Sequence, residues 1–289
     1  MIATTGREFR FGVNMMAPAK RADWVDKCRK AEQLGYDVIA VADHIGMPAP
    51  FPAIVLAAEA TERVRLCSFV LNTSFYNPVL LARDAAGTDQ FVDGRLDLGL
   101  GTGYVKAEFD AAGLPFPGPG ARLDHLEHAI AELRKRFADE QRPPPPLLLG
   151  GQRDRMLRIA AREADIVGFT GVSFTRDGAA ARTSGPVELA ERVEFVRAQA
   201  GSRFAELELN LLVQHVQVTD DRRGALEELR ALAPDRTAEE LAELPVLLVG
   251  TLDEIAEQVR SRREDYGFTY FTVMEKDLDA FSAVLGRLR

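Results

Sequence analysis

The chain has 289 residues, 46% of them hydrophobic and 28% charged, and a formal net charge of −8. This length is enough to bury one large core, and the acidic balance argues against a general nucleic-acid-binding protein, which would carry a basic face. No signal peptide opens the chain, and no apolar run reaches the roughly 18 residues that span a bilayer. We therefore expect a cytoplasmic protein that binds neither nucleic acid nor membrane.

The two cysteines lie in segments of different predicted structure. Cys28 falls on a predicted helix and Cys67 on a predicted buried strand. In a reducing compartment, such residues are small core hydrophobes rather than disulfide partners. We expect both to be buried free thiols.

Short apolar runs alternate with helix-like stretches along the whole chain. Alternating apolar residues at 9–14 predict the first strand, and apolar residues at helical spacing in 23–35 predict the helix that follows, with Gly35 as its cap. Further strands are predicted at 36–42, 64–71, 95–100, 147–149, 165–169, 207–218 and 268–274. Further helices are predicted at 51–62, 78–91, 122–138, 154–164, 186–200, 251–266 and 277–288.

Eight such strand–helix units predict a (β/α)8 TIM barrel of the α/β class, with one domain over 1–289. Residues 170–185 are rich in Gly, Ser and Thr without a period, and we interpret them as a mobile loop over the barrel mouth. Residues 220–244 are charged and helical in pattern, and we interpret them as an insertion between strands 7 and 8. Active sites of such barrels form at the C-terminal ends of the strands.

One strand end is rich in glycine. The segment 96–103, Leu-Asp-Leu-Gly-Leu-Gly-Thr-Gly, superficially matches methyltransferase and dinucleotide-binding motifs. Both folds require a long helix directly afterwards and then a strand that ends in an acidic residue, and this chain has neither in place. Glycines still let a phosphate or a planar ring approach the backbone N–H groups, although a simple turn is the alternative.

Two other strand ends carry groups that can react or bind anions. Asp43 and His44 follow the second strand, where a histidine titrates near neutral pH within reach of a ligand; an ordinary loop histidine is an equal alternative. Gly150 and Gly151 precede Arg153 at a helix start, which indicates a phosphate or carboxylate site.

The other histidines do not indicate a metal. His125 and His128 are three residues apart on a charged helix without a third ligand, so we interpret them as part of a solvated face. His215 lies within the seventh strand, where a hydrogen-bonded core residue is the expectation.

Taken together, four segments resemble the bacterial luciferase-like superfamily: Val-Ala-Asp-His at 41–44, the stretch 72–78, the stretch 93–103, and the two glycines at 150–151. The resemblance covers nearly the whole chain, including 249–254 and 280–285. The superfamily contains flavin-dependent monooxygenases and oxidoreductases that use the deazaflavin coenzyme F420. Ala-Asp-His after strand 2 and Gly-Thr-Gly after strand 4 look like the glucose-6-phosphate dehydrogenases of the F420 branch. The resemblance thus implies F420 as cofactor, with FMN as the alternative.

The resemblance also implies roles for individual residues. Asp43 would contact the deazaflavin ring, Asn72 the ring or its ribityl chain, and His44 would stabilise a charge or relay a proton during hydride transfer. A non-proline cis peptide between Phe69 and Val70 would support the ring face. Thr102, Gly103, Gly150 and Gly151 would hold the ribityl and phosphate groups, and Arg153 would lie near the phosphate or the acidic tail.

The chain departs from these dehydrogenases at Tyr104, where they have a glutamate acid. Tyrosine donates a proton but is a poor base at neutral pH, and Glu108 is a poor positional match. A reductase that delivers hydride to an activated C=C, C=N or C=O bond of a small molecule therefore fits better than an alcohol dehydrogenase. His44 or Tyr104 would supply the proton.

Two other functions remain as alternatives, an FMN-dependent monooxygenase and a non-catalytic cofactor-binding paralogue. Relatives are commonly dimers, so we expect a homodimer, with the apolar helices after strands 2 and 3 as its interface.

Overall fold

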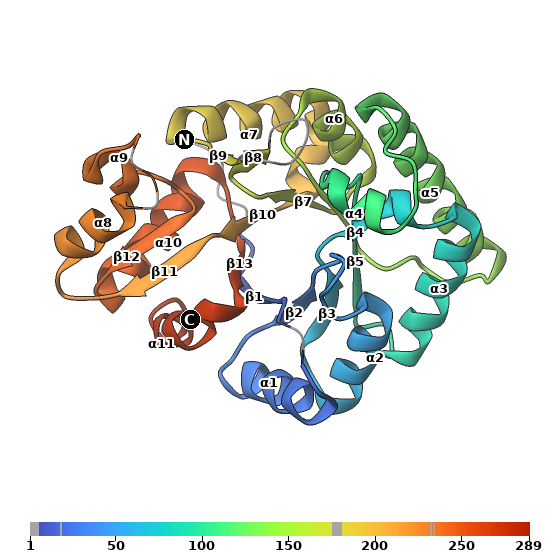
Figure 1. The fold of residues 1–289 in the computed structure, drawn as a ribbon, viewed down its shortest axis with the longest axis horizontal. Coiled ribbons are helices and arrows are strands. Elements are labelled where there is room, and N and C mark those ends of the chain that lie inside the picture. Colours follow the sequence, from blue (N-terminus) through green and yellow to red (C-terminus); the bar gives the residue numbers. More distant parts are fainter. Residues whose placement is uncertain (1–5, 18, 175–180, 232, 234) are drawn as a thin grey trace.

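A closed barrel of parallel strands forms the centre of the molecule (Figure 1). The computed structural model describes residues 6–17, 19–174, 181–231, 233 and 235–289. Within them, the barrel closes where β3 and its extension β4 pair with β5, which confirms the predicted eight-stranded architecture. The barrel strands are β1 (Arg10–Met15), β2 (Val38–Val41), β3 (Arg65–Ser68) with β4 (Leu71–Asn72), β5 (Leu96–Gly101), β6 (Leu147–Gly150), β7 (Ile166–Phe169), β10 (Glu208–Val213) and β13 (Tyr270–Met274).

Helices surround the barrel and bury its outer face (Figure 1). They are α1 (Arg21–Gln33), α2 (Pro50–Ala60), α3 (Pro78–Phe91), α4 (Lys106–Ala111), α5 (Pro119–Asp139), α6 (Asp154–Glu163), α7 (Pro186–Ala200), α8 (Arg222–Arg230), α9 (Ala238–Ala242), α10 (Leu252–Tyr266) and α11 (Leu278–Leu285). Short 3₁₀ helices are η1 (Thr73–Phe75), η2 (Gly201–Glu206) and η3 (Glu275–Asp277). Within the described ranges, none of the helices combines the length and the apolar character needed to cross a bilayer.

Each strand alternates between the helix-facing core and the barrel interior. In β1, Phe11, Val13 and Met15 pack in the outer core, so Gly12 and Asn14 face inward. A Cβ on Gly12 would lie 3.1 Å from the ring of Tyr270, which belongs to the interior cluster. Both cysteines are buried free thiols, as predicted.

Three of the predicted segments differ from the structure: the third strand, the seventh strand and the mouth segment 170–185. The third strand is interrupted, because the peptide bond between Phe69 and Val70 is cis and separates β3 from β4. The seventh strand is not continuous: the chain leaves the barrel after Val213, and β11 (His215–Val218) pairs in parallel with β12 (Leu247–Gly250) instead. The helical insertion is confirmed as α8 and α9, which lie with β11 and β12 at one side of the ring (Figure 1).

The mouth segment 170–185 is not an irregular loop throughout. Val172–Phe174 (β8) and Ala181–Thr183 (β9) form an antiparallel ribbon, with Val172 opposite Thr183. Composition alone does not predict this pairing, because each strand has only three residues. Residues 175–180 of the predicted loop lie outside the described residues.

The N-terminal end of the barrel is filled by a network of paired charges. The Asp97 carboxylate accepts hydrogen bonds from Arg10 and Arg65, each at 2.7 Å, and Arg10 also pairs with Glu208 at 2.5 Å. Burial raises the pKa of the Glu208 carboxyl, and the guanidinium of Arg10 opposes that rise. The two carboxylates have lost almost all contact with water and depend on the guanidinium groups, which remain partly exposed.

We predict that Asp97→Ala lowers the free energy of unfolding by roughly 3–5 kcal/mol, because it leaves two guanidinium groups facing one carboxylate in the interior. Urea denaturation measures the change. The control is Asp139→Asn, which removes an exposed ion pair with Lys135 and should change stability little. Equal effects of the two substitutions would contradict a structural role for the network.

Candidate active site

The C-terminal ends of β2, β4 and β5 meet through the side chains of Asp43 and Asn72. Asp43 accepts hydrogen bonds from the backbone N–H of Asn72 at 2.9 Å and from the hydroxyl of Tyr76 at 3.2 Å. Burial raises the pKa of Asp43, while these two hydrogen bonds lower it. The buried Asn72 amide lies so close to Gly103 that a Cβ there would collide with it. Segments that are 60 residues apart in sequence are therefore joined at one rim.

Val70 lies against glycines of two strands, and only the glycine on β5 has to lack a side chain to make room for it. A Cβ on Gly101 would lie 2.7 Å from Val70 Cγ2, and one on Gly150 would lie 3.6 Å from Val70 Cγ1. The cis peptide predicted between Phe69 and Val70 is present, and both side chains are only partly buried. The interior at this level thus presents one apolar side chain between stretches of bare backbone.

His44 is paired with Glu108, a residue that is a poor positional match for the glutamate acid of the dehydrogenases. The short helix α4 carries Glu108 back to the rim, where its Oε1 lies 2.8 Å from Nδ1 of His44. The ring of Tyr104 stands edge-on to the imidazole, with centroids 5.8 Å apart. Burial and the charge of Glu108 both raise the pKa of Tyr104. Glu108 therefore belongs to the site as the partner of His44, and the helix-forming run 106–111 around it is the sequence signal that could indicate this.

Hydroxyl groups tie the turn after β4 to the turn after β5. Thr73 Oγ1 donates to the carbonyl of Gly101 at 2.8 Å, and Ser74 Oγ donates to the carbonyl of Thr102 at 3.1 Å. Gly103 then takes a positive φ of 73°, which a residue with a side chain adopts only at a cost. The Gly-Thr-Gly turn is consequently fixed against β4 and η1.

The remaining histidines lie elsewhere. His125 is not on a solvated face as expected, because its Nε2 lies 3.0 Å from the carbonyl oxygens of Thr73 and Tyr76 and holds η1 in place. His128 is exposed, as predicted. His215 is hydrogen-bonded, to Gln217 at 3.2 Å, but it is half-buried in β11 outside the barrel rather than in the core. In the described parts of the chain, no three His, Cys, Asp or Glu residues are grouped as metal ligands would be.

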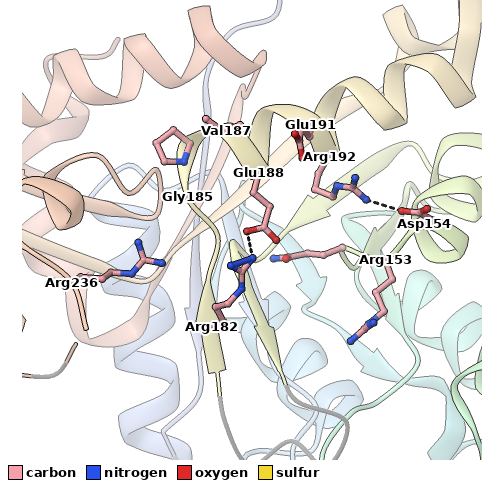
Figure 2. Close-up of a pocket in the computed structure, with 11 residues that line it drawn as sticks. Arg153, Asp154, Arg182, Gly185, Val187, Glu188, Glu191, Arg192 and Arg236 are labelled. Atoms are coloured by element: carbon pink, nitrogen blue, oxygen red, sulfur yellow. Dashed lines mark hydrogen bonds and ion pairs between the residues drawn. The ribbon is translucent and has the colours of Figure 1, made fainter. Parts of the chain in front are cut away.

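Beyond Gly150 the rim opens into a cleft of about 950 Å³ (Figure 2). Its arginines come from four separate segments: Arg153, Arg182, Arg192 and Arg236. Arg182 pairs with Glu188 at 2.6 Å and Arg192 with Asp154 at 2.7 Å, whereas Arg153 forms no ion pair with any residue that the structure describes. An exposed guanidinium of this kind is available to an anion.

The structure therefore brings most of the predicted site residues to one rim. Asp43 accepts a hydrogen bond from Asn72, and Asn72 packs against Gly103. His44 follows Asp43 in the chain and pairs with Glu108, and Val70 lies beside Gly101 and Gly150. Thr102 and Tyr104 flank Gly103. Gly151 adjoins the start of α6, because a Cβ there would lie 2.5 Å from Met156, and Arg153 lies outside the rim in the cleft.

The model of the luciferase-like monooxygenase family matches residues 8–244. The chain belongs to this family. Among luciferase-like relatives, an F420-dependent glucose-6-phosphate dehydrogenase of Intrasporangium calvum is 36% identical over 128 residues, which are 40% of this chain and 38% of that protein. A second, of Nakamurella multipartita, is 27% identical over 83% of this chain and 78% of that protein.

The chain thus spans about two fifths of the length of the first of these relatives. A solved structure, of an F420-dependent secondary alcohol dehydrogenase with an F420–acetone adduct, superposes with a TM-score of 0.77. The superposition covers 98% of this chain and 100% of that chain at 17% identity. This likeness shows the luciferase-like barrel fold.

Gly103→Ala tests whether the packing of Asn72 at the rim requires a glycine at position 103. Gly103 and Gly113 both have positive φ, 73° and 66°, but a Cβ on Gly113 would meet nothing within 4 Å. Each alanine should cost about 1–2 kcal/mol of unfolding free energy for the left-handed backbone. Only Gly103→Ala should add roughly 1–3 kcal/mol for displacing Asn72, as measured by urea denaturation. If Gly113→Ala lowers the free energy of unfolding as much as Gly103→Ala does, the contact with Asn72 contributes nothing beyond the cost of the left-handed backbone.

Proposed function

We propose that the protein is a deazaflavin (coenzyme F420)-dependent oxidoreductase that reduces an activated C=C, C=N or C=O bond of a small molecule. The observation that carries the proposal is the His44–Glu108 pair on the same rim as Asp43 and Asn72. A paired histidine at a barrel strand end is suited to hold and release a proton beside a bound ring. The relatives named for F420 support the same cofactor.

The residues present fit a flat tricyclic group. Gly101 and Gly150 leave bare backbone around Val70, and the turn at Gly103 is fixed against Asn72, so a ring face has an apolar support with polar groups at its edge. We assign the ring to Asp43, Phe69, Val70 and Asn72. We assign the ribityl and phosphate groups to Thr102, Gly103, Gly150 and Gly151, with Arg153 at the phosphate or acidic tail.

When bound, reduced F420 supplies a hydride. The chain's own residues manage the proton. Because a carboxylate only accepts hydrogen bonds, Glu108 requires Nδ1 of His44 to carry its hydrogen, which leaves Nε2 to hold or give up a proton. Tyr104 keeps its hydroxyl proton at neutral pH, since its pKa is raised, and it can donate a second hydrogen bond to a substrate.

Reduction remains the proposed direction. Glu108 reaches His44 instead of standing at position 104, so it acts on the imidazole rather than as a separate acid facing a substrate. The dehydrogenases have a carboxylate where this chain has Tyr104. In this chain Glu108 brings a carboxylate to the site instead, and its role is to position His44. We propose that His44 is the proton donor and that Tyr104 assists it.

A cofactor-binding screen tests the function. Purified protein is titrated with oxidised F420, FMN and nicotinamide dinucleotides, with fluorescence as the readout, and we expect F420 to bind most tightly. If neither F420 nor FMN binds, the proposal is wrong. The monooxygenase alternative, which the description of the family model favours, predicts oxygen uptake with reduced FMN and none with reduced F420.

His44→Ala should lower turnover by ~10²-fold or more, the usual contribution of a general acid–base group. Glu108→Gln should lower it by roughly tenfold, because an amide orients the imidazole less firmly than a carboxylate. The readout is the rate of oxidation of reduced F420 by an acceptor that the wild type reduces.

Asp110→Asn on the same helix is the control, since Asp110 pairs with exposed Lys106, and its rate should not change. A loss below tenfold for His44→Ala would contradict the role of His44 as the proton donor.

We further propose that the chain folds as one domain over 1–289, that it acts in the cytoplasm, and that it forms a homodimer through α2 and α3. Val79 and Leu80 in the first turn of α3 support the interface, because they are 57% and 49% exposed despite being large and apolar.

A further inference from the structure

The side chain of Asn14 is buried inside the barrel without a hydrogen-bond partner. Only 4% of Asn14 is exposed, and its Oδ1 is fully buried and unsatisfied. Its Nδ2 likewise has no partner among the residues that the structure describes. Both halves of the carboxamide are therefore free to bind something else.

Asn14 lies near the C-terminal end of the barrel. In β1 it faces inward, opposite Ala40 of β2 and Met274 of β13, and only Met15 follows it in the strand. The next level toward the rim holds Phe69, whose N–H donates to the carbonyl of Val41 at 2.7 Å. Asn14 is thus about one pleat deeper than the partly buried pair Phe69 and Val70, which we assigned to the ring face.

A second inward-facing asparagine shows what a structural role looks like. Asn210 of β10 is fully buried near the charged network, at the register of Tyr270. Its Oδ1, like that of Asn14, has no partner in the described part of the chain, but its Nδ2 donates to Thr272 Oγ1 at 2.9 Å and to the carbonyl of Tyr270 at 3.3 Å, and these two bonds set it apart from Asn14. Asn14 makes neither kind of bond, so it does not brace the barrel.

Keeping such a group has a cost. A buried polar group without a partner costs about 1–3 kcal/mol, and the neighbour Ala40 offers only apolar surface. An aliphatic side chain at position 14 would avoid this cost. Buried polar groups without a partner in the protein are typical of binding sites, where a ligand supplies the missing hydrogen bonds.

We propose that the Asn14 carboxamide binds the –CO–NH– edge of the tricyclic cofactor ring. Its Oδ1 accepts the ring N–H, and its Nδ2 donates to the adjacent ring carbonyl, which is the pairing that an amide makes with a lactam. The inference rests on the proposed function. The ring is favoured over a substrate because Asn14 lies below Phe69 and Val70, whereas His44 and Tyr104 lie at the rim where a substrate arrives.

The test measures stability and cofactor affinity separately. In cofactor-free protein, Asn14→Leu should leave the melting temperature unchanged or raise it, because it removes an unsatisfied polar group. In titrations without substrate, the same variant should bind oxidised F420 at least roughly tenfold more weakly, because two hydrogen bonds are lost. Asn14→Ala, which cannot clash with its neighbours, should show the same loss of affinity.

The matched control is Asn210→Leu, which should lower the melting temperature because it removes two hydrogen bonds inside the barrel. A comparable fall in melting temperature for Asn14→Leu would overturn the inference and give Asn14 a structural role. Wild-type affinity for F420 in both Asn14 variants would also overturn the inference. If, in addition, the KM for the acceptor rises, Asn14 binds the substrate and not the cofactor ring. If the wild type binds neither F420 nor FMN, the proposed function fails and the inference with it.

Discussion

The arrangement of the rim depends on how closely β5 approaches the interrupted strand formed by β3 and β4. A Cβ on Gly99 would collide with the carbonyl oxygen of Ser68, and one on Gly101 would collide with Val70. The barrel can close across the interrupted strand only because Gly99 and Gly101, the two inward-facing positions of β5 nearest the rim, lack side chains. With that closure in place, the turns after β4 and β5 come within hydrogen-bonding reach, and Asn72 packs against Gly103. The candidate site is therefore a consequence of the closure rather than an addition to it.

Much of this arrangement could be predicted from the sequence, because strand ends carry their own signals. Asp43, Asn72 and Gly103 follow apolar runs, and parallel strands of a barrel bring such ends together. The features that could not be predicted depend on tertiary pairing. Glu108 gains its importance from a short helix that points back to His44, and the run after Val213 continues as a strand but changes partners. Neither periodicity nor composition records which neighbour a segment will meet.

The two ends of the barrel differ in how their charged groups are paired. At the N-terminal end, Arg10, Asp97 and Glu208 satisfy one another and contribute to holding the strands together, although Oδ1 of Asn210 and the hydroxyl of Tyr270 lack a partner there among the residues that the structure describes. At the C-terminal end, Asn14 is left without a partner and Arg153 forms no ion pair within the described residues. The first arrangement contributes stability and the second gives some of it up. Such a division lets one fold stay rigid while its open end is adapted to a ligand.

Gln152 has a further consequence for how this barrel can change. Its Nε2 donates to Thr170 Oγ1 at 3.0 Å and to the carbonyl of Val172 at 3.1 Å, and its Oε1 accepts from Ser184. Both arms of the β8–β9 ribbon are thereby anchored by one side chain that belongs to the turn after β6. A ribbon secured at its base can be exchanged for one of different length or chemistry without disturbing the strands beneath it. The described arms of this ribbon, 172–174 and 181–183, are therefore positions at which the chain can vary while the strands of the barrel keep their arrangement.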